Sequence, residues 1–320
     1  MGKIEYEPNF IRYATFVALF PQLIAGPIDR ASHLLPQLKA PPHIGVRNFT
    51  DGLGYFVVGL FKKVVIADYL ALYVDKIYGD TITASGAALA VATFAYSWQI
   101  YFDFSGYTDM ARGVAKTMGY DLMLNFNNPY LAKSLGEFWQ RWHISLSTWF
   151  KDYLYIPLGG NRKGKFHTYL NMSITMVVSG LWHGAAWTFV IWGALHALGR
   201  IITRELEQTS FYVKKVPDIV KLLIVFIFIN LTWIFFRSPT FAQALYVIKK
   251  IITGPYENPQ FPLVGLVLIF SVWLYQFVYE SKFRNILETR TVRIIGVVAM
   301  LICILIVSSD SAQPFIYQQF

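Results

Sequence analysis

Residues 166–199 read FHTYLNMSITMVVSGLWHGAAWTFVIWGALHALG, a run of 34 residues without Asp, Glu, Lys or Arg. A membrane crossing needs about 20 apolar residues. This run is therefore too long for one ordinary crossing and only just long enough for two. We expect a short helical hairpin, with Gly180–Gly184 near its turn or at membrane depth.

The composition of the whole chain agrees with this segment. Of 320 residues, 55% are hydrophobic and 15% are charged, and the mean hydropathy is +0.42. A soluble domain carries nearer a quarter of its residues as charged side chains, and the 26 Phe, 20 Tyr and 9 Trp exclude a disordered chain. The composition predicts an all-α polytopic membrane protein.

The charges indicate topology rather than a nucleic-acid partner. The net charge is +9, from 28 basic and 19 acidic residues. The basic residues stand in short clusters between apolar runs, which is typical of loops held on the cytoplasmic side. The only cysteine, Cys303, lies in an apolar run, so neither an intrachain disulfide nor a cysteine-based metal site is expected.

Other apolar segments predict the remaining membrane elements of one domain over residues 1–320, with no internal repeat. The mixed run Asp51–Tyr78 contains Lys62, Lys63 and Asp68, so we expect an amphipathic or re-entrant helix whose charges face a protein interior. The predicted crossings are Thr81–Phe102, Leu222–Phe236, Asn258–Tyr279 and Ile294–Ser309, with Tyr13–Ile28 as a kinked or partly inserted helix that contains Pro21 and Pro27.

Residues 103–165 are more polar and rich in aromatic side chains. Apolar residues recur there at helical spacing, which predicts a helix lying in the membrane interface. These residues are Phe138, Trp139, Trp142, Leu146, Trp149 and Phe150. The carboxylates Asp103 and Asp109 flank the end of a predicted crossing, where they could orient a base or pair with Arg112.

His183 lies inside the longest uncharged run of the chain. An ionisable residue at membrane depth is by default a hypothesis for a functional site. A histidine in such surroundings is expected to be neutral, which is the form that a general base requires. A satisfied core histidine remains the alternative. His143 lies just off the apolar stripe, where its position favours a polar-face role, and His196 is expected to be structural.

Two other patterns are weaker. Residues 159–166, GGNRKGKF, approach a phosphate-binding P-loop, but Phe166 replaces the Ser or Thr that binds magnesium and no strand precedes them. Arg162, Lys163 and Lys165 are therefore expected to form a basic turn at the membrane face, with contact to a donor's phosphates as the alternative. The six histidines show no metal-ligand spacing, so no metal is expected.

Taken in order, several segments resemble the membrane-bound O-acyltransferase (MBOAT) family, in particular its alginate O-acetyltransferase-like bacterial branch. The resemblance covers roughly residues 8–320. Members of this branch usually carry further transmembrane helices before the segment that matches Pro8–Ile28, so this chain is expected to hold the core and C-terminal part of the family domain. The matching segments are FPQLIAGPI (20–28), FDFSGYTDM (102–110), NFNNPY (125–130), EFWQRWH (137–143), WFKDYLYIPLGGNR (149–162) and GLWHGA (180–185).

The resemblance implies a fold and an activity. The fold is a ring of tilted transmembrane helices, with re-entrant and interfacial helices, around a central tunnel. His183 falls on the family's catalytic histidine and His143 on its second characteristic histidine. In the tunnel, Trp182 and Trp187 would exclude water, and Asn127 or Asn128 could stabilise an oxyanion. The residues expected to line or support the tunnel are Trp182, Asp103, Asn127, Asn128, Trp142 and Arg141.

The expected reaction is O-acetyl transfer in the bacterial inner membrane. The resemblance implies that acetyl-CoA or another acyl thioester enters from the cytoplasmic side, without any cofactor. An extracytoplasmic relay protein and a polysaccharide, in alginate or another exopolysaccharide or cell-wall glycan, would receive the acetyl group. Three alternatives stay open: transfer of D-alanine, a transporter or export component without chemistry, and a scaffold fragment.

Overall fold

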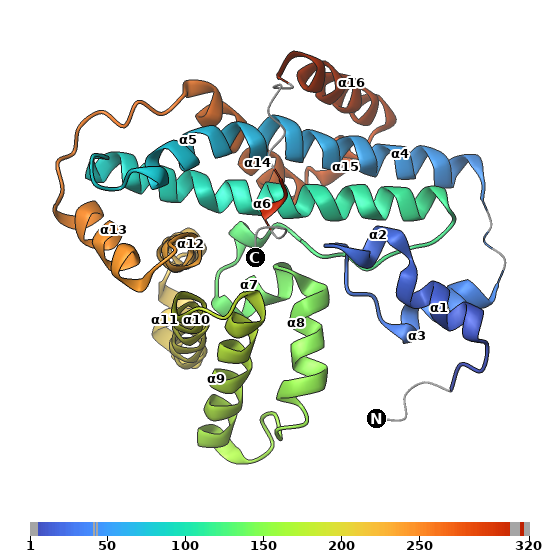
Figure 1. Cartoon of the computed structure of the whole chain (residues 1–320), viewed down its shortest axis with the longest axis horizontal. Helices are drawn as coiled ribbons and strands as arrows, with labels where there is room; N and C mark the ends of the chain where they lie inside the picture. The colour runs from blue at the N-terminus through green and yellow to red at the C-terminus, as the bar shows by residue number, and fades with distance from the viewer. Residues whose placement is uncertain (1–5, 41, 43, 308–313, 317–320) are drawn as a thin grey trace. The chain divides into compact units, whose positions relative to one another are not determined.

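The computed structural model describes residues 6–40, 42, 44–307 and 314–316, and these residues contain helices and no β-strand (Figure 1). The chain packs as two compact units. The first consists of Met1–Asp68, Tyr101–Asn125 and Val278–Gln319, and the second of Tyr69–Ile100 and Phe126–Phe277. The long helix α6 (Gly86–Thr117) contributes to both units. The prediction of one domain over residues 1–320 stays a prediction.

In the first unit helix α4 (Val46–Leu60) continues into the π-helical turn η1 (Phe61–Ala67). Helix α5 (Asp68–Gly79) follows without a break, and its residues after Asp68 belong to the second unit. Lys63 lies in the π-helical turn, and its Nζ is 2.8 Å from Asp68 Oδ1 and 2.6 Å from Asp103 Oδ1. The expectation that charges of Asp51–Tyr78 face a protein interior is confirmed for Lys63 and Asp68, which are buried, whereas Lys62 is only partly buried.

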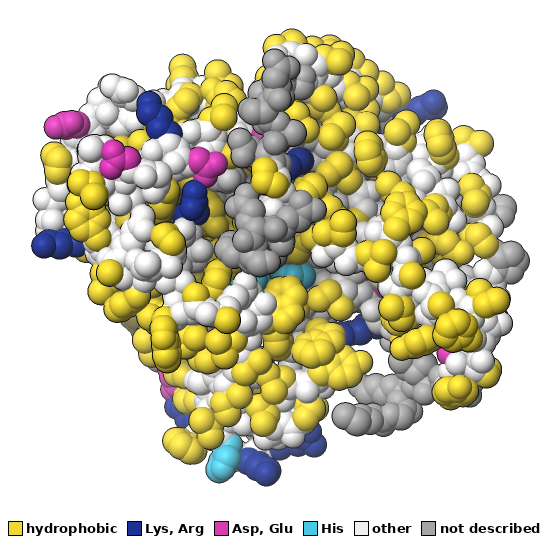
Figure 2. All heavy atoms as spheres, in the orientation of Figure 1, with side chains coloured by type: hydrophobic (Ala, Val, Ile, Leu, Met, Phe, Trp, Pro, Cys, Tyr) yellow, Lys and Arg dark blue, Asp and Glu magenta, His cyan; other side chains and the backbone are white. Residues whose placement is uncertain are grey.

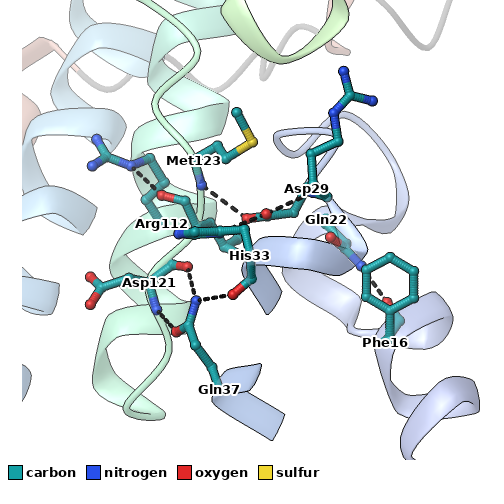
Figure 3. Close-up of polar contacts among 10 residues, drawn as sticks. Phe16, Gln22, Asp29, His33, Gln37, Arg112, Asp121 and Met123 are labelled. Carbon is teal, nitrogen blue, oxygen red and sulfur yellow. Dashed lines mark hydrogen bonds and ion pairs between the residues drawn. The ribbon is translucent and has the colours of Figure 1, made fainter. Parts of the chain in front are cut away.

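The N-terminal helices of this unit are held to the end of α6. They are α1 (Phe10–Ala18), α2 (Phe20–Leu23) and α3 (Ala31–Lys39), and the predicted kink lies at Leu19, just before Pro21. Asp29 accepts hydrogen bonds from the backbone N–H of Met123 (3.0 Å) and contacts His33 Nδ1 at 2.7 Å (Figure 3). Below it, Gln37 and the backbone of Asp121 exchange two hydrogen bonds. Leu19 and Leu34 pack with Ala115 and Leu122 into a small apolar core.

The second unit contains the hairpin predicted for residues 166–199. Helices α9 (Gly164–His183) and α10 (Trp187–Leu206) are joined by a three-residue turn, so the hairpin and its turn position are confirmed. The two helices are antiparallel, and their backbones approach closely where a glycine of one helix faces the other helix. A Cβ on Gly180 would lie 2.2 Å from the Phe189 carbonyl oxygen, and one on Gly193 would lie 2.4 Å from that of Met176.

The remaining elements complete both units. In the second unit they are η2 (Pro129–Leu131), α7 (Leu135–Arg141), α8 (Ile144–Phe150), η3 (Lys151–Tyr155), α11 (Ser210–Lys215), α12 (Asp218–Arg237), α13 (Phe241–Thr253) and most of α14 (Leu263–Tyr279). In the first unit they are α15 (Arg284–Leu287) and α16 (Arg290–Val307), and α16 packs on α4 and η1.

Among the described residues, α12 and α16 are long and apolar enough to cross a membrane, and α14 is a shorter apolar helix. Helices α6, α9 and α10 coincide with predicted crossings but carry more polar side chains. None of the residues of α16 is buried within the chain, and hydrophobic side chains cover much of the surface at its place in Figure 2. The arrangement of helices around a tunnel stays a prediction.

Candidate functional site

His183 ends α9 and is enclosed by aromatic rings. Its side chain is 8% exposed. The ring centroid lies 4.9 Å from that of Trp182, 5.3 Å from Trp192 and 5.2 Å from Phe236, with Phe189 at 6.5 Å. These rings come from three helices, α9, α10 and α12, so the hairpin and α12 together build the surroundings of the histidine.

His143 is also buried, at 3% exposure, although its sequence position favours a polar face. That expectation is wrong because the expected continuous interfacial helix is interrupted. Helix α7 ends at Arg141 and α8 begins at Ile144, while His143 between them has φ 41° and ψ 54°. This left-handed conformation turns the chain and places the ring 6.2 Å from Trp182, which also touches His183.

Hydrogen bonds stabilise the two short helices before and after this interruption. The Ser134 side chain accepts a hydrogen bond from the Glu137 backbone N–H, which caps the start of α7. The Trp142 N–H donates to the Phe138 carbonyl oxygen, and the Ser147 N–H donates to that of His143. A non-glycine residue in the left-handed region costs about 1–2 kcal/mol, and such conformations cluster at functional sites.

The burial of His143 also affects its charge. Desolvation lowers the pKa of the imidazole well below its ordinary value, and the nearby His183 acts in the same direction. His143 is therefore neutral at physiological pH and can hold or accept a proton.

A third histidine lies in the same aromatic cluster. His196 on α10 is fully buried, with its ring 4.6 Å from Trp192 and 5.1 Å from Trp139. Neither of its ring nitrogens has a hydrogen-bond partner among the described residues. Because Trp192 touches both His183 and His196, the three histidines belong to one aromatic cluster within the second unit.

The supporting residues expected before α7 and at its end lie close to His143. The Asn127 N–H donates to the Arg141 carbonyl oxygen at 2.9 Å, and Arg141 Nη1 donates back to the Asn127 carbonyl oxygen at 3.1 Å. Asn128 has a left-handed conformation with φ 45°. Trp142 is buried against Phe126, with ring centroids 5.0 Å apart. This segment positions the chain at His143, whereas the Asn127 side chain is exposed.

Asp103 lies in the first unit. Besides Lys63, it accepts a hydrogen bond from the Ile316 N–H at 2.8 Å. Asp109 lies 2.6 Å from Lys62 and 3.9 Å from Arg112. Both carboxylates are thus engaged in ion pairs, and the support that Asp103 is expected to give to a tunnel stays a prediction.

A cavity of about 410 Å³ lies beside the histidine cluster. Ser179, one turn before His183, contributes to its lining, and so do Trp139 and three cations from η3 and α10, Lys151, Arg200 and Arg204. Because α9 and α10 are antiparallel, Ser179 and Arg204 lie at opposite ends of the hairpin. The cavity therefore extends from a basic region to Ser179, one turn before His183, and none of the three buried histidines is part of its lining.

The basic turn before α9 does not contribute to that lining. Arg162 Nη2 donates to the Ile156 carbonyl oxygen, and Lys165 pairs with Glu205. Lys163 directly precedes the first residue of α9. The sequence pointed to this turn because its cations are adjacent along the chain. Lys151, Arg200 and Arg204 were missed because only the fold brings them together.

Within the described residues, no group of three or more His, Cys, Asp or Glu side chains could hold a metal ion. The exclusion of water by Trp182 and Trp187 stays a prediction. Trp187 is 77% exposed, and the half-exposed Trp182 lies against the His183 ring together with the buried Trp192 and Phe236.

The sequence profile of the membrane-bound O-acyltransferase family matches residues 3–252. The chain belongs to this family. Among its MBOAT relatives, a peptidoglycan O-acetyltransferase of Helicobacter pylori is 44% identical over 247 residues, which cover 76% of this chain and 47% of the relative. A probable alginate O-acetylase AlgI of Pseudomonas aeruginosa is 46% identical over 230 residues, 72% of this chain and 44% of the relative.

A more distant MBOAT relative transfers a different group. A teichoic acid D-alanyltransferase of Bacillus subtilis is 30% identical over 215 residues, which cover 62% of this chain and 52% of the relative. The chain spans about half the length of the curated relatives that it matches. The match over residues 3–252 covers part of each compact unit and includes His143, His183 and His196.

Proposed function

We propose that this protein is a membrane O-acyltransferase that moves an acetyl group from a thioester to a hydroxyl acceptor. The observation that carries the proposal is the buried His183 in its aromatic enclosure, with the neutral His143 against the same Trp182 ring. Membership of the MBOAT family and the names of the relatives from Helicobacter pylori and Pseudomonas aeruginosa, at 44% and 46% identity, support acetyl transfer in particular.

The chemistry assigned to His183 is general-base catalysis. As the acceptor oxygen attacks the thioester carbonyl carbon, its proton moves to the neutral imidazole. When the intermediate collapses, the C–S bond breaks and the imidazolium returns the proton to the leaving thiolate. General acid–base catalysis by a positioned side chain contributes typically about 10²–10⁴-fold. The surrounding aromatic rings would exclude water and so limit hydrolysis of the thioester.

The cavity supplies a binding site for the thioester donor. Acetyl-CoA carries several phosphate charges at one end and the reactive thioester at the other. Lys151, Arg200 and Arg204 match the charged end, and the lining that leads to Ser179 brings the thioester towards His183. The basic turn with Arg162, Lys163 and Lys165 would then receive phosphates only outside the cavity. No cofactor is required, since the acyl thioester itself drives the transfer.

Membership of the family supports a setting for the proposed reaction. The helices would surround a tunnel in a multi-pass protein of the bacterial inner membrane, with the donor on the cytoplasmic side. The acceptor would be an extracytoplasmic relay or acetyltransferase protein that modifies a polysaccharide. The names of the relatives favour an exopolysaccharide or a cell-wall glycan as the final acceptor.

Two other functions make different predictions. A D-alanyltransferase would accept D-alanine from a carrier-bound thioester, in line with the relative at 30% identity. A transporter or export component would move a solute and leave no covalent product. Buried histidines also suit a proton relay, so the experiment must detect the covalent product.

Inside-out vesicles that contain the full chain test the proposal directly. The vesicles receive acetyl-CoA labelled in the acetyl group, and label bound covalently to protein or glycan is measured after free acetyl-CoA and acetate are removed. The proposal predicts covalent label that depends on the chain. Soluble label inside the vesicles without covalent product would support transport instead. Covalent transfer from a D-alanyl carrier thioester but not from acetyl-CoA would support the D-alanyl alternative.

A further inference from the structure

The indole nitrogen of Trp192 is a buried hydrogen-bond donor without an acceptor. The side chain is 1% exposed, and Nε1 has no hydrogen-bond partner among the described residues. Leaving a buried polar group unsatisfied costs about 1–3 kcal/mol. Among the described residues, Nε1 of Trp139, Trp233 and Trp273 is also buried without a partner, so the position of Trp192 is what relates it to function.

The position of this ring relates it to the proposed chemistry. The centroid of Trp192 lies 5.3 Å from that of His183, and the two planes are nearly perpendicular at 85°. Of the four rings described around His183, two belong to phenylalanines and Trp182 is half-exposed. Trp192 is therefore the buried ring in this enclosure that carries an N–H.

Two other neighbours of the Trp192 ring, His196 and Phe236, do not accept this hydrogen bond among the described residues. His196 lies 4.6 Å from Trp192 and could accept a hydrogen bond, but neither of its nitrogens does so among the described residues. Phe236, at 5.5 Å, has no acceptor. The indole ring of Trp192 is thus buried among aromatic rings next to His183. In such an apolar environment a hydrogen bond from an N–H to a negatively charged oxygen is strongest.

We infer that Trp192 Nε1–H is the oxyanion donor of the acyl transfer, an inference that rests on the proposed function. As the acceptor oxygen bonds to the thioester carbon, the carbonyl π pair moves onto the carbonyl oxygen, and His183 holds the acceptor's proton. Trp192 donates its hydrogen bond to that oxyanion. The pair then returns to re-form C=O, the C–S bond breaks, and the thiolate leaves with the proton from His183.

This assignment is favoured over Asn127, one of the two asparagines considered from the sequence. Asn127 is exposed and holds Arg141 through its backbone, so its side chain lies in a region of high dielectric. A donor in water-excluded surroundings contributes more to transition-state stabilisation than an exposed one. The buried indole satisfies this requirement and the exposed amide does not.

The test compares steady-state acetyl transfer by the full chain and its variants in membrane vesicles. Trp192→Phe removes the N–H and keeps an aromatic ring. We expect kcat to fall about 10²–10³-fold, with little change in the KM for acetyl-CoA and an unchanged pH profile. Trp273→Phe is the matched control, because Trp273 also has a buried Nε1 without a partner among the described residues, but packs on Trp98 and Phe226. It should retain wild-type kcat.

A second replacement separates the hydrogen bond from packing. β-(3-benzothienyl)alanine at position 192 has the shape of tryptophan with sulfur in place of N–H, so it should fold and show the same loss of kcat. Wild-type kcat in this variant would overturn the inference. Trp192→Phe with wild-type kcat would also overturn it.

The proposed function is tested separately in the same assay. His183→Gln should abolish transfer, and full activity in that variant would overturn the proposed role of His183. An inactive His183→Gln variant together with an active benzothienyl variant would overturn the role of Trp192 alone.

Discussion

The backbone at His143 explains how two histidines that are forty residues apart in the sequence come to contact one tryptophan. Its φ of 41° ends one helix and starts the next, which turns the imidazole into the protein. Histidine adopts this region more readily than most residues. The aromatic spacing of residues 138–150 continues across the break, so periodicity alone predicted one helix. The prediction failed because a single residue can reverse the chain without changing that pattern.

The conformation of His143 predicts an unusual order of stability. Both His143→Gly and His143→Ala remove the imidazole, but only alanine places a Cβ in the left-handed region. We expect the glycine variant to be more stable by up to about 1 kcal/mol. Thermal unfolding of the purified protein in detergent measures the difference. An alanine variant more stable than the glycine variant would show that position 143 is not left-handed in solution.

The residues around His183 could be predicted only in part. His183 itself stood out because the surrounding 34 residues carry no charge. Trp192 lies nine positions further on, and its position in the sequence does not distinguish it from the other tryptophans of the chain. It reaches His183 because the turn at Gly184–Ala186 folds α10 back along α9. Such a contact depends on the geometry of the hairpin, which spacing along the sequence does not specify.

At the scale of elements, α4 and α6 approach each other closely in the first unit through glycine. A Cβ on Gly52 would lie 2.7 Å from the Gly113 carbonyl oxygen, whereas one on Gly54 would meet nothing within 4 Å. Both glycines lie in α4. Replacing Gly52 or Gly54 by alanine therefore distinguishes two effects on stability. Both replacements add a Cβ to α4, but only the one at Gly52 interferes with the close packing of α4 on α6.

We expect Gly52→Ala and Gly54→Ala to change stability in opposite directions. Gly52→Ala forces the two backbones apart and should destabilise the protein by about 1–3 kcal/mol. Gly54→Ala should be neutral or stabilise the helix by up to about 1 kcal/mol. Midpoints of thermal unfolding check both. Equal midpoints for the two variants would contradict the close approach of α4 to α6.

The buried ion cluster of Lys63, Asp68 and Asp103 gives a second prediction for these elements. Lys63→Met leaves two buried carboxylates without their cation and should destabilise the protein by about 3–5 kcal/mol. Replacing both aspartates by asparagine in the same protein should recover part of the loss. Lys116→Met is the control, because Lys116 pairs with the exposed Asp121, and it should change stability by less than about 1 kcal/mol. Equal effects of the two lysine replacements would contradict a structural role for the cluster.

For the whole molecule, composition predicted the class of protein, and the helices agree with it. The two units, however, recombine distant segments, since residues 101–125 and 278–319 join the N-terminal part of the chain. Apolar runs identify crossings but not their partners, so this division could not be predicted. Contacts within the protein also explain why α6, α9 and α10 are more polar than an isolated membrane crossing. These helices use polar side chains for those contacts.

The unburied surface of α16 predicts where its cysteine lies. Cys303 is the only cysteine of the chain, and it stands in a helix apolar enough to span a membrane. We expect a charged thiol reagent to leave Cys303 unlabelled in intact membranes and to label it after denaturation. The control is Gln208→Cys combined with Cys303→Ser, which places the thiol in the exposed loop after α10 and should react in opened membranes. Fast labelling of Cys303 in membranes would contradict the membrane location of α16.

If His183 carries the proton in acetyl transfer, replacing it must slow transfer, whereas replacing another histidine of α9 must not. Transfer of labelled acetyl from acetyl-CoA is measured in vesicles with the wild-type chain, His183→Ala and His167→Ala. His167 lies on the same helix but is exposed, so its loss controls for removing a histidine from α9. We predict that His183→Ala lowers the rate by at least about 10²-fold, while His167→Ala transfers at the wild-type rate. Wild-type transfer by a correctly folded His183→Ala protein would contradict this role of His183.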